Sequence, residues 1–186
     1  MVILALADRS PGVSIVNLIA KHHVDLVCTL GDLNYFSLRE LEEVTNTPKI
    51  GVYGNHCSGN YFELLNIYNL HLKTFKYAGL TFGGFKGSVR YKDSPYAKMY
   101  TQQEAQELLK NFPAVDVFLA HCPPYGINDE PNDLAHQGFI ALKDYLINCQ
   151  PKYFLHGHTY PRTNNLIEKY HSTNIIYVHG AKIIEI

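Results

Sequence analysis

Apolar runs of strand length alternate with segments of helical spacing over the first third of the chain. The strand-like runs are continuously apolar, which is typical of strands that are buried on both faces of a sheet. Ser37 followed three residues later by Glu40 indicates a capped helix. Strands that alternate with helices predict a parallel sheet covered by helices. The predicted elements are strands at 2–7, 25–30 and 49–53, and helices at 13–22 and 37–44.

The rest of the chain predicts a second group of strands with two further helices. Ala78-Gly79 is a two-residue hairpin signal between two strand-like runs, and Gly83, Gly84 and Gly87 predict a flexible loop. We therefore expect one α/β domain spanning residues 1–186, with two packed sheets and outer helices. The predicted strands are 70–77, 80–85, 115–120, 153–155, 166–171, 175–179 and 182–186, and the predicted helices are 134–148 and 101–111, the latter starting with a Thr-x-x-Glu capping box.

The composition is that of an ordinary globular protein. The chain has 186 residues, 46% apolar and 18% charged, which suffices for a substantial core without disulfides. The net charge is −1 and no basic run stands out, which argues against stable nucleic-acid binding. We see no signal peptide and no apolar run of membrane-spanning length, and nothing in the composition predicts an oligomeric state. The four cysteines are dispersed without a Cys-x-x-Cys pair, so we expect free thiols and a cytoplasmic protein.

Polar side chains follow the ends of five predicted strands. In a parallel sheet these ends meet at one edge, which is where open α/β sheets bind ligands. Carboxylate, amide oxygen and imidazole together suit a divalent transition-metal ion. Each residue by itself also has a structural explanation as a helix cap, a turn residue or a packed histidine, but the ordered set predicts a metal site. Its members are Asp8, Asp32, Asn55, His56, His121, His156 and His158.

The order and spacing of four motifs resemble those of the calcineurin-like metallophosphoesterases. These motifs are Gly31-Asp32, Gly54-Asn55-His56, His121 and Gly157-His158. The segments 121–125 and 153–158 look especially similar to small bacterial members of that superfamily. The resemblance covers roughly residues 1–162 and implies a four-layer α/β/β/α sandwich with a two-metal centre. It also implies a hydrolase, a phosphatase or phosphodiesterase whose phosphate-ester substrate is a small molecule or a nucleotide.

The same resemblance implies a role for each residue of the predicted site. Asp32 would bridge two ions, Asp8 would bind the first of them, and His56 would protonate the leaving oxygen or stabilise charge on phosphorus. The residues implied for the second ion are Asn55, His121 and His158. The implied nucleophile is a metal-bound hydroxide, in accord with the lowered pKa of water on a divalent ion. The cofactor would be one or two ions of manganese, iron, zinc or nickel.

The first metal site has lost both of its expected imidazoles. The Asp-x-His of the family is Asp8-Arg9-Ser10 here, and its Gly-His-x-His ends in Tyr160. Three explanations stay open. The first site is weak or empty; Ser10, Tyr35 or Tyr160 replaces an imidazole; or the guanidinium of Arg9 supplies positive charge. The depletion also keeps open a different function, a catalytically weakened metal-binding module for protein interaction on the same fold.

The remaining histidines differ in their predicted roles. His156 lies at a strand end before a glycine and is expected to support the site. His136 follows the long loop 122–133, so it either faces the substrate or is structural. Three histidines lie in strand-like segments and are expected to be structural: His71, His171 and His179.

Overall fold

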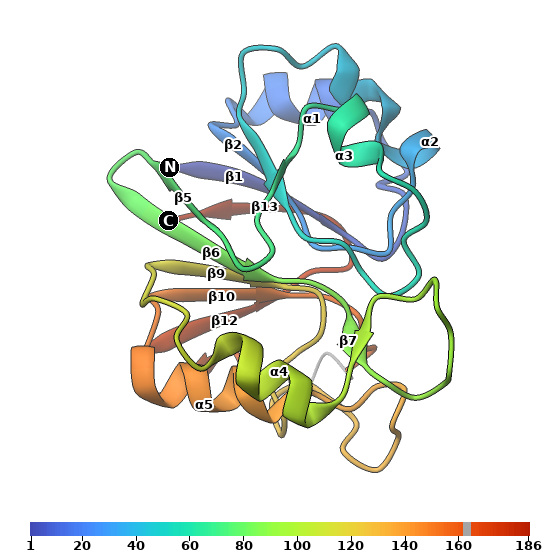
Figure 1. Ribbon diagram of the computed structural model, residues 1–186. Helices are drawn as coiled ribbons and strands as arrows, with labels where there is room; N and C mark the ends of the chain where they lie inside the picture. The colour runs from blue at the N-terminus through green and yellow to red at the C-terminus, as the bar shows by residue number, and fades with distance from the viewer. Residues whose placement is uncertain (162–164) are drawn as a thin grey trace.

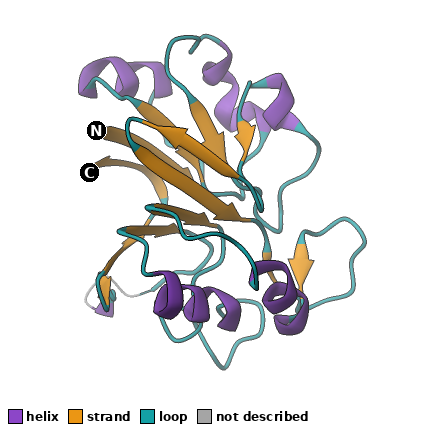
Figure 2. Cartoon of the chain, turned by 60° about the vertical axis from the view of Figure 1, so that its left-hand side comes forward, coloured by secondary structure: helices purple, strands orange, loops and turns teal. Residues whose placement is uncertain are grey.

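Two β-sheets pack face to face, and helices cover the outer face of each sheet (Figures 1 and 2). The computed structural model describes residues 1–161 and 165–186. The two chain ends lie side by side, because the amino group of Met1 donates to the carbonyl oxygen of Ile186 at 2.8 Å. The layers form the four-layer α/β/β/α sandwich that the sequence predicts.

The first sheet is parallel except at one edge. Its order is β13-β1-β2-β3-β4, in which β13 runs antiparallel to β1 and the other pairs are parallel. Closing the sheet with the last strand of the chain places residues 180–185 beside residues 2–7. The strands are β1 (Val2–Ala7), β2 (Leu26–Thr29), β3 (Lys49–Gly51), β4 (Tyr68–Asn69) and β13 (Gly180–Glu185).

The second sheet has a parallel centre with an antiparallel strand at each edge. Its order is β11-β12-β10-β9-β6-β5, in which β12, β10, β9 and β6 are parallel. Its strands are β5 (Thr74–Tyr77), β6 (Leu80–Phe85), β9 (Val117–Ala120), β10 (Tyr153–His156), β11 (Lys169–Tyr170) and β12 (Thr173–Tyr177). A separate two-stranded ribbon pairs β7 (Ser88–Val89) with β8 (Met99–Tyr100).

The helices divide between the two sheets. The first sheet is covered by α1 (Ile15–His22), α2 (Tyr35–Leu38), the 3₁₀ helix η1 (Arg39–Glu42) and α3 (Tyr61–Leu64), and the second by α4 (Gln102–Leu109) and α5 (Ile140–Cys149). Along β1, Ile3 and Ala5 face the second sheet while Leu4 and Leu6 face the helices. Both faces of the strand are therefore buried, which explains its continuous apolar run.

Two local predictions are confirmed. Strands β5 and β6 form a hairpin in which Ala78 and Gly79 both have positive φ, 48° and 78°, as a two-residue turn requires. At α4, the Thr101 side chain accepts from the Glu104 N–H, and the Glu104 carboxylate accepts from the Thr101 N–H at 2.7 Å. This reciprocal pair is the predicted capping box.

The boundaries of two predicted helices are wrong. Asn34, not Ser37, is the N-cap of α2; Ser37 takes the third helical position, where its N–H donates to Asn34 at 2.9 Å. The last predicted helix begins at Ile140 instead of residue 134. The preceding residues are held in a loop, because the Gly138 N–H donates to the carboxylate of Asp129 at 2.8 Å. Tertiary hydrogen bonds therefore replace the helical ones there.

The predicted flexible loop at Gly83 and Gly84 is also wrong. Both residues lie within β6, paired with β9, and are buried. A Cβ atom at Gly83 would lie 2.7 Å from the ring of Phe112, and one at Gly84 would lie 2.8 Å from Val52. The glycines are needed for close packing on both faces of the strand.

The cysteines agree with the expectation of free thiols. Cys28, Cys57, Cys122 and Cys149 are free thiols, and burial raises the pKa of Cys57 and Cys122. Among the described residues, no helix has the length and apolarity needed to cross a membrane.

We expect His71 to make folding sensitive to acid. Burial, aided by the charge of Lys86, lowers the pKa of His71 from 6.5 to about 3. Below pH 6.5 the unfolded chain binds a proton there and the folded chain does not. The free energy of unfolding should therefore fall, by at most about 1.4 kcal/mol per pH unit, as the pH drops from 6.5 towards 3.

His71→Gln should reduce this slope in urea titrations between pH 4 and 6.5, since glutamine cannot take up the proton. The matched control is His171→Gln in the exposed turn between β11 and β12. An unchanged slope in His71→Gln would contradict the assignment.

Candidate metal centre

Loops at the carboxyl ends of strands from both sheets meet at one place. Asp8 follows β1, and the loop after β2 carries Asp32. The loops after β9 and β10 carry His121 and His158. Hydrogen bonds join these loops directly: the Asp8 N–H donates to Gly31 at 3.0 Å. The site thus lies where the two sheets join, as expected for ligand sites in open α/β sheets.

A central cluster consists of Asp32, Asn55, His121 and His158. One ligand atom each from Asp32, His121 and His158 lies within 4.8 Å of the others. The Nε2 atom of His121 is 3.4 Å from the Asp32 carboxylate and 3.0 Å from the amide oxygen of Asn55. Side chains more than 120 positions apart are therefore gathered into a space that fits a single ion.

Backbone carbonyls fix the orientation of both imidazoles. The Nδ1 atom of His121 lies 2.8 Å from the carbonyl oxygen of Leu30, and Nε2 of His158 lies 2.9 Å from that of Ala135. A carbonyl oxygen only accepts, so these two nitrogens carry the hydrogens. In each neutral ring the other nitrogen then keeps its lone pair, as in histidines that bind metals.

Two facing acceptor atoms of the cluster fit a cation. In its neutral form, Nε2 of His121 is an acceptor, and it faces the Asn55 oxygen, another acceptor. A carboxylate, an amide oxygen and two imidazole nitrogens are ligands that divalent transition metals accept. The central cluster therefore fits such an ion.

The electrostatics of the cluster favour positive charge. Burial lowers the pKa of His121, but the carboxylates of Asp32 and Asp8 outweigh it and raise the pKa overall. Burial raises the pKa of Asp32, but the charge and hydrogen bond of His121 outweigh it and lower the pKa to about 2. Burial lowers the pKa of His158 to about 3. His158 is consequently neutral near pH 7, with its lone pair available.

The backbone is strained at three residues of the site. Asp8, Asp32 and His158 have φ of 64°, 50° and 72°, in the left-handed region that such residues seldom adopt. Such strain costs about 1–3 kcal/mol per residue and persists where surrounding contacts enforce it. A Cβ atom at Gly54 would clash with the Asp32 carboxylate, and one at Gly157 would lie 2.7 Å from that of Asp8. Glycine is thus required beside both carboxylates.

Asp8 and His56 border the central cluster. The carboxylate of Asp8 is 4% exposed, accepts from the His158 N–H at 3.0 and 3.1 Å, and lies 3.9 Å from Nδ1 of His121. The His56 N–H donates to Asp32 at 2.8 Å, while its imidazole is exposed, 3.5 Å from the hydroxyl of Tyr91. Both residues therefore contact members of the central cluster.

The other predicted site residues are more scattered. The hydroxyl of Tyr35 donates to the Glu42 carboxylate at 2.6 Å, so its hydrogen bond is to η1 and not to a residue of the central cluster. Arg9 and Ser10 are exposed beside Asp8. Tyr160 is 63% exposed, and its ring lies 6.2 Å from that of His136.

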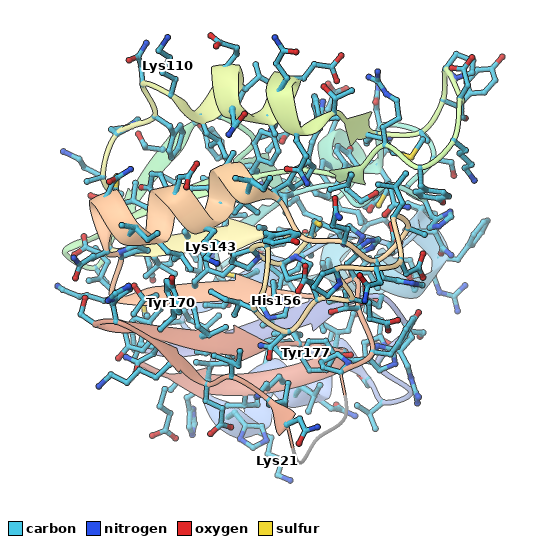
Figure 3. The ribbon with its side chains drawn as sticks, turned by 90° about the horizontal axis from the view of Figure 1, so that it is seen from below. Lys21, Lys110, Lys143, His156, Tyr170 and Tyr177 are labelled. Carbon is cyan, nitrogen blue, oxygen red and sulfur yellow. The ribbon has the colours of Figure 1, made fainter. Side chains whose placement is uncertain are left out.

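His156 and His136 both lie near His158: His156 ends β10, two residues earlier, and His136 comes from the loop before α5. His156 is fully buried, its Nε2 atom accepts from Asn128 at 3.1 Å, and its ring lies 5.6 Å from Tyr177 (Figure 3). The ring of His136 lies 5.8 Å from that of His158, and its Nδ1 atom is 2.6 Å from Asp133. The loop that carries His136 also provides the Ala135 carbonyl that orients His158.

His179 lies beside Asp8, where the sequence predicts no site residue. It was expected to be structural, but its side chain is 30% exposed, with Nδ1 3.7 Å from the Asp8 carboxylate. Its ring also lies 5.5 Å from that of Tyr160. No local motif identifies this residue; it reaches the site because β13 pairs with β1 across the sheet.

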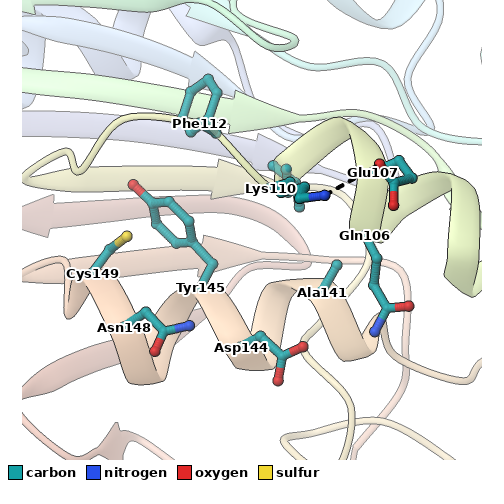
Figure 4. Close-up of a pocket in the computed structure, with 10 residues that line it drawn as sticks. Gln106, Glu107, Lys110, Phe112, Ala141, Asp144, Tyr145, Asn148 and Cys149 are labelled. Atoms are coloured by element: carbon teal, nitrogen blue, oxygen red, sulfur yellow. Dashed lines mark ion pairs between the residues drawn. The ribbon is translucent and has the colours of Figure 1, made fainter.

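Several hollows among the described residues lie outside the central cluster. One, of about 440 Å³, lies between α4 and α5 and is lined by residues such as Phe112 and Tyr145 (Figure 4). Another, of about 500 Å³, is bounded by the 126–131 segment and Tyr160, and a third, of about 510 Å³, includes Ser10. The last two therefore include residues near the site.

We expect divalent ions to stabilise the folded chain through Asp32. An ion at 100 times its dissociation constant adds about 2.7 kcal/mol to the free energy of unfolding. Thermal melts with Mn²⁺ or Zn²⁺ should show a rise in Tm for the wild type and a much smaller one for Asp32→Asn. The control Asp144→Asn, on the exposed side of α5, should respond like the wild type. Equal shifts in all three proteins would contradict a metal site at Asp32.

Comparisons with known proteins agree with this geometry. One solved structure matches with a TM-score of 0.67 at 16% identity, covering 94% of this chain and 89% of its own. The protein TT1561 of Thermus thermophilus matches with a TM-score of 0.65 at 18% identity, covering 96% and 88%. These likenesses establish the fold. No curated protein matches this chain.

The family model described as calcineurin-like phosphoesterase matches residues 13–162. The matched span includes every residue of the central cluster and begins after Asp8. Since it covers most of the chain, the protein belongs to the calcineurin-like phosphoesterases, a family of metal-dependent enzymes that act on phosphate esters.

Proposed function

We propose that this chain hydrolyses a phosphate monoester or diester, of a small molecule or a nucleotide, with a divalent transition-metal ion as cofactor. Manganese, iron, zinc and nickel all suit the ligand types. The proposed ligands are Asp32, Asn55, His121 and His158. The observation that supports this most is the pair of imidazoles, each oriented by a backbone carbonyl, with the other nitrogen of His121 facing the Asp32 carboxylate and the Asn55 amide oxygen.

The residues of the central cluster would bind and orient the reacting groups. A bound ion would supply Lewis acidity, which polarises a phosphoryl oxygen and makes water a better nucleophile at neutral pH. Asp32 holds negative charge at neutral pH, because its pKa is about 2. The Leu30 and Ala135 carbonyls keep the rings of His121 and His158 from turning. These contacts preorganise the site before substrate arrives.

His56 is the proposed general acid. Its backbone N–H is anchored to Asp32 at 2.8 Å, while its imidazole is exposed beside the central cluster. An exposed ring near the ligands can donate a proton to a leaving oxygen of bound substrate. The hydroxyl of Tyr91, 3.5 Å from Nε2 of His56, borders the same space.

The core packing and the cysteines bear on the domain organisation and the location that we propose. Three apolar clusters, one between the two sheets and one beneath each layer of helices, join all four layers, which supports a single functional domain over residues 1–186. The four dispersed free thiols fit a reducing compartment such as the cytoplasm.

We expect His56→Ala to lower kcat by about 10²- to 10⁴-fold, the usual contribution of general acid catalysis. Metal content should remain that of the wild type, because only the backbone of His56 touches Asp32. The measurements are steady-state kinetics and metal analysis on the same preparation. His22→Ala, at the end of α1, is the control. If metal and activity were lost in equal measure, His56 would be a ligand instead.

Turnover should depend on both metal and Asp32. Nitrophenyl phosphate and bis-nitrophenyl phosphate would be assayed with Mn²⁺, Fe²⁺, Zn²⁺ or Ni²⁺, for the wild type and for Asp32→Asn. We expect metal-dependent release of nitrophenol by the wild type alone, and the ratio of the two substrates separates monoesterase from diesterase activity. Metal binding without turnover of either ester would favour the alternative, a metal-binding interaction module that retains the fold but not catalysis.

A further inference from the structure

Asp8 is a buried carboxylate with few hydrogen bonds, although the imidazole of His121 lies 3.9 Å away. Its side chain is 4% exposed. Among the described residues, its hydrogen bonds come from a single donor, the N–H of His158, which both oxygens share. An ionised carboxylate can accept about four hydrogen bonds. A buried charge of this kind is costly unless a cation lies nearby.

The pairing of the first and last strands brings His179 to this carboxylate. Ala7 lies opposite Gly180 in the antiparallel register of β1 and β13. One step beyond that pair, Asp8 faces His179, and Nδ1 of His179 lies 3.7 Å from the carboxylate. This separation exceeds that of a hydrogen bond, which is typically about 2.7–3.2 Å. The two groups approach without a direct bond.

We propose that His179 replaces the imidazoles missing from the family's metal site at Asp8, so that Asp8 and His179 together bind a second divalent ion, in addition to the one in the central cluster. This inference rests on the proposed function, in which an ion occupies the central cluster. Two ligand atoms about 2.0–2.2 Å from a tetrahedral ion lie about 3.4 Å apart. The observed 3.7 Å thus needs only a small shift. Asp32, whose charge acts on Asp8, is the third protein group near this position.

The surroundings of His179 suit the binding of an ion that exchanges with solvent. Its side chain is 30% exposed, whereas that of His121 in the central cluster is fully buried. The ring of Tyr160 lies edge-on, 5.5 Å away, and restricts the imidazole from one side. With fewer protein ligands and more solvent, the second ion should bind more weakly than the first, with water completing its shell.

The test counts ions and does not depend on activity. Equilibrium dialysis of the full chain against Mn²⁺, and separately Zn²⁺, gives ions per chain as a function of free ion. The wild type should bind one ion tightly and a second more weakly. His179→Ala should keep the tight ion and lower the affinity for the weak one by about tenfold or more. The matched control, His171→Ala, removes another exposed histidine of the last strands and should bind like the wild type.

A further variant distinguishes metal binding by His179 from a requirement for positive charge beside Asp8. His179→Lys keeps a cation beside Asp8, but a protonated amine has no lone pair for a metal. We expect it to lose the second ion as His179→Ala does. Two ions in either variant with wild-type affinities would overturn the proposal. A single ion in the wild type would overturn it while leaving the proposed function intact, and no bound ion would overturn both.

Discussion

Two buried carboxylates at the junction of the sheets impose the constraint on which the site depends. The side chains of Asp8 and Asp32 are 4% and 15% exposed, and each raises the cost of charging the other. Negative charge removed from water must be balanced by cations or by N–H donors. The imidazole of His121 and the backbone N–H groups of His56 and His158 provide part of that balance. A divalent ion would complete it.

This constraint also accounts for the shape of the surrounding backbone. The loops turn through left-handed conformations at Asp8, Asp32 and His158 so that carboxylates and N–H groups meet. Gly54 and Gly157 leave room for the carboxylate oxygens, which a Cβ atom would displace. The strain is local, and the rigid sheets on either side hold it in place.

The two halves of the site are unequal, and the difference bears on function. The central cluster is buried and its imidazoles are fixed by carbonyls of Leu30 and Ala135, whereas the region of Asp8 is open towards His179 and Tyr160. Membership of the family supports phosphate esters as the general class of substrate. A shared fold does not specify which ester is bound.

The sequence by itself determined most strands of the two sheets, the capping box of α4, the hairpin at Ala78-Gly79 and the residues proposed for the central cluster, but it did not predict β4, β7 or β8. Each follows from local chemistry: apolar runs, turn residues, and polar residues at strand ends that parallel pairing must bring together. Only the tertiary structure decided that residues 134–139 form a loop, that Gly83 and Gly84 pack within a strand, and that His179 faces Asp8. These features depend on contacts between distant segments, above all the register of β13 against β1. Local propensity does not predict which strands pair, because a strand pairs with whichever edge the assembled sheet presents.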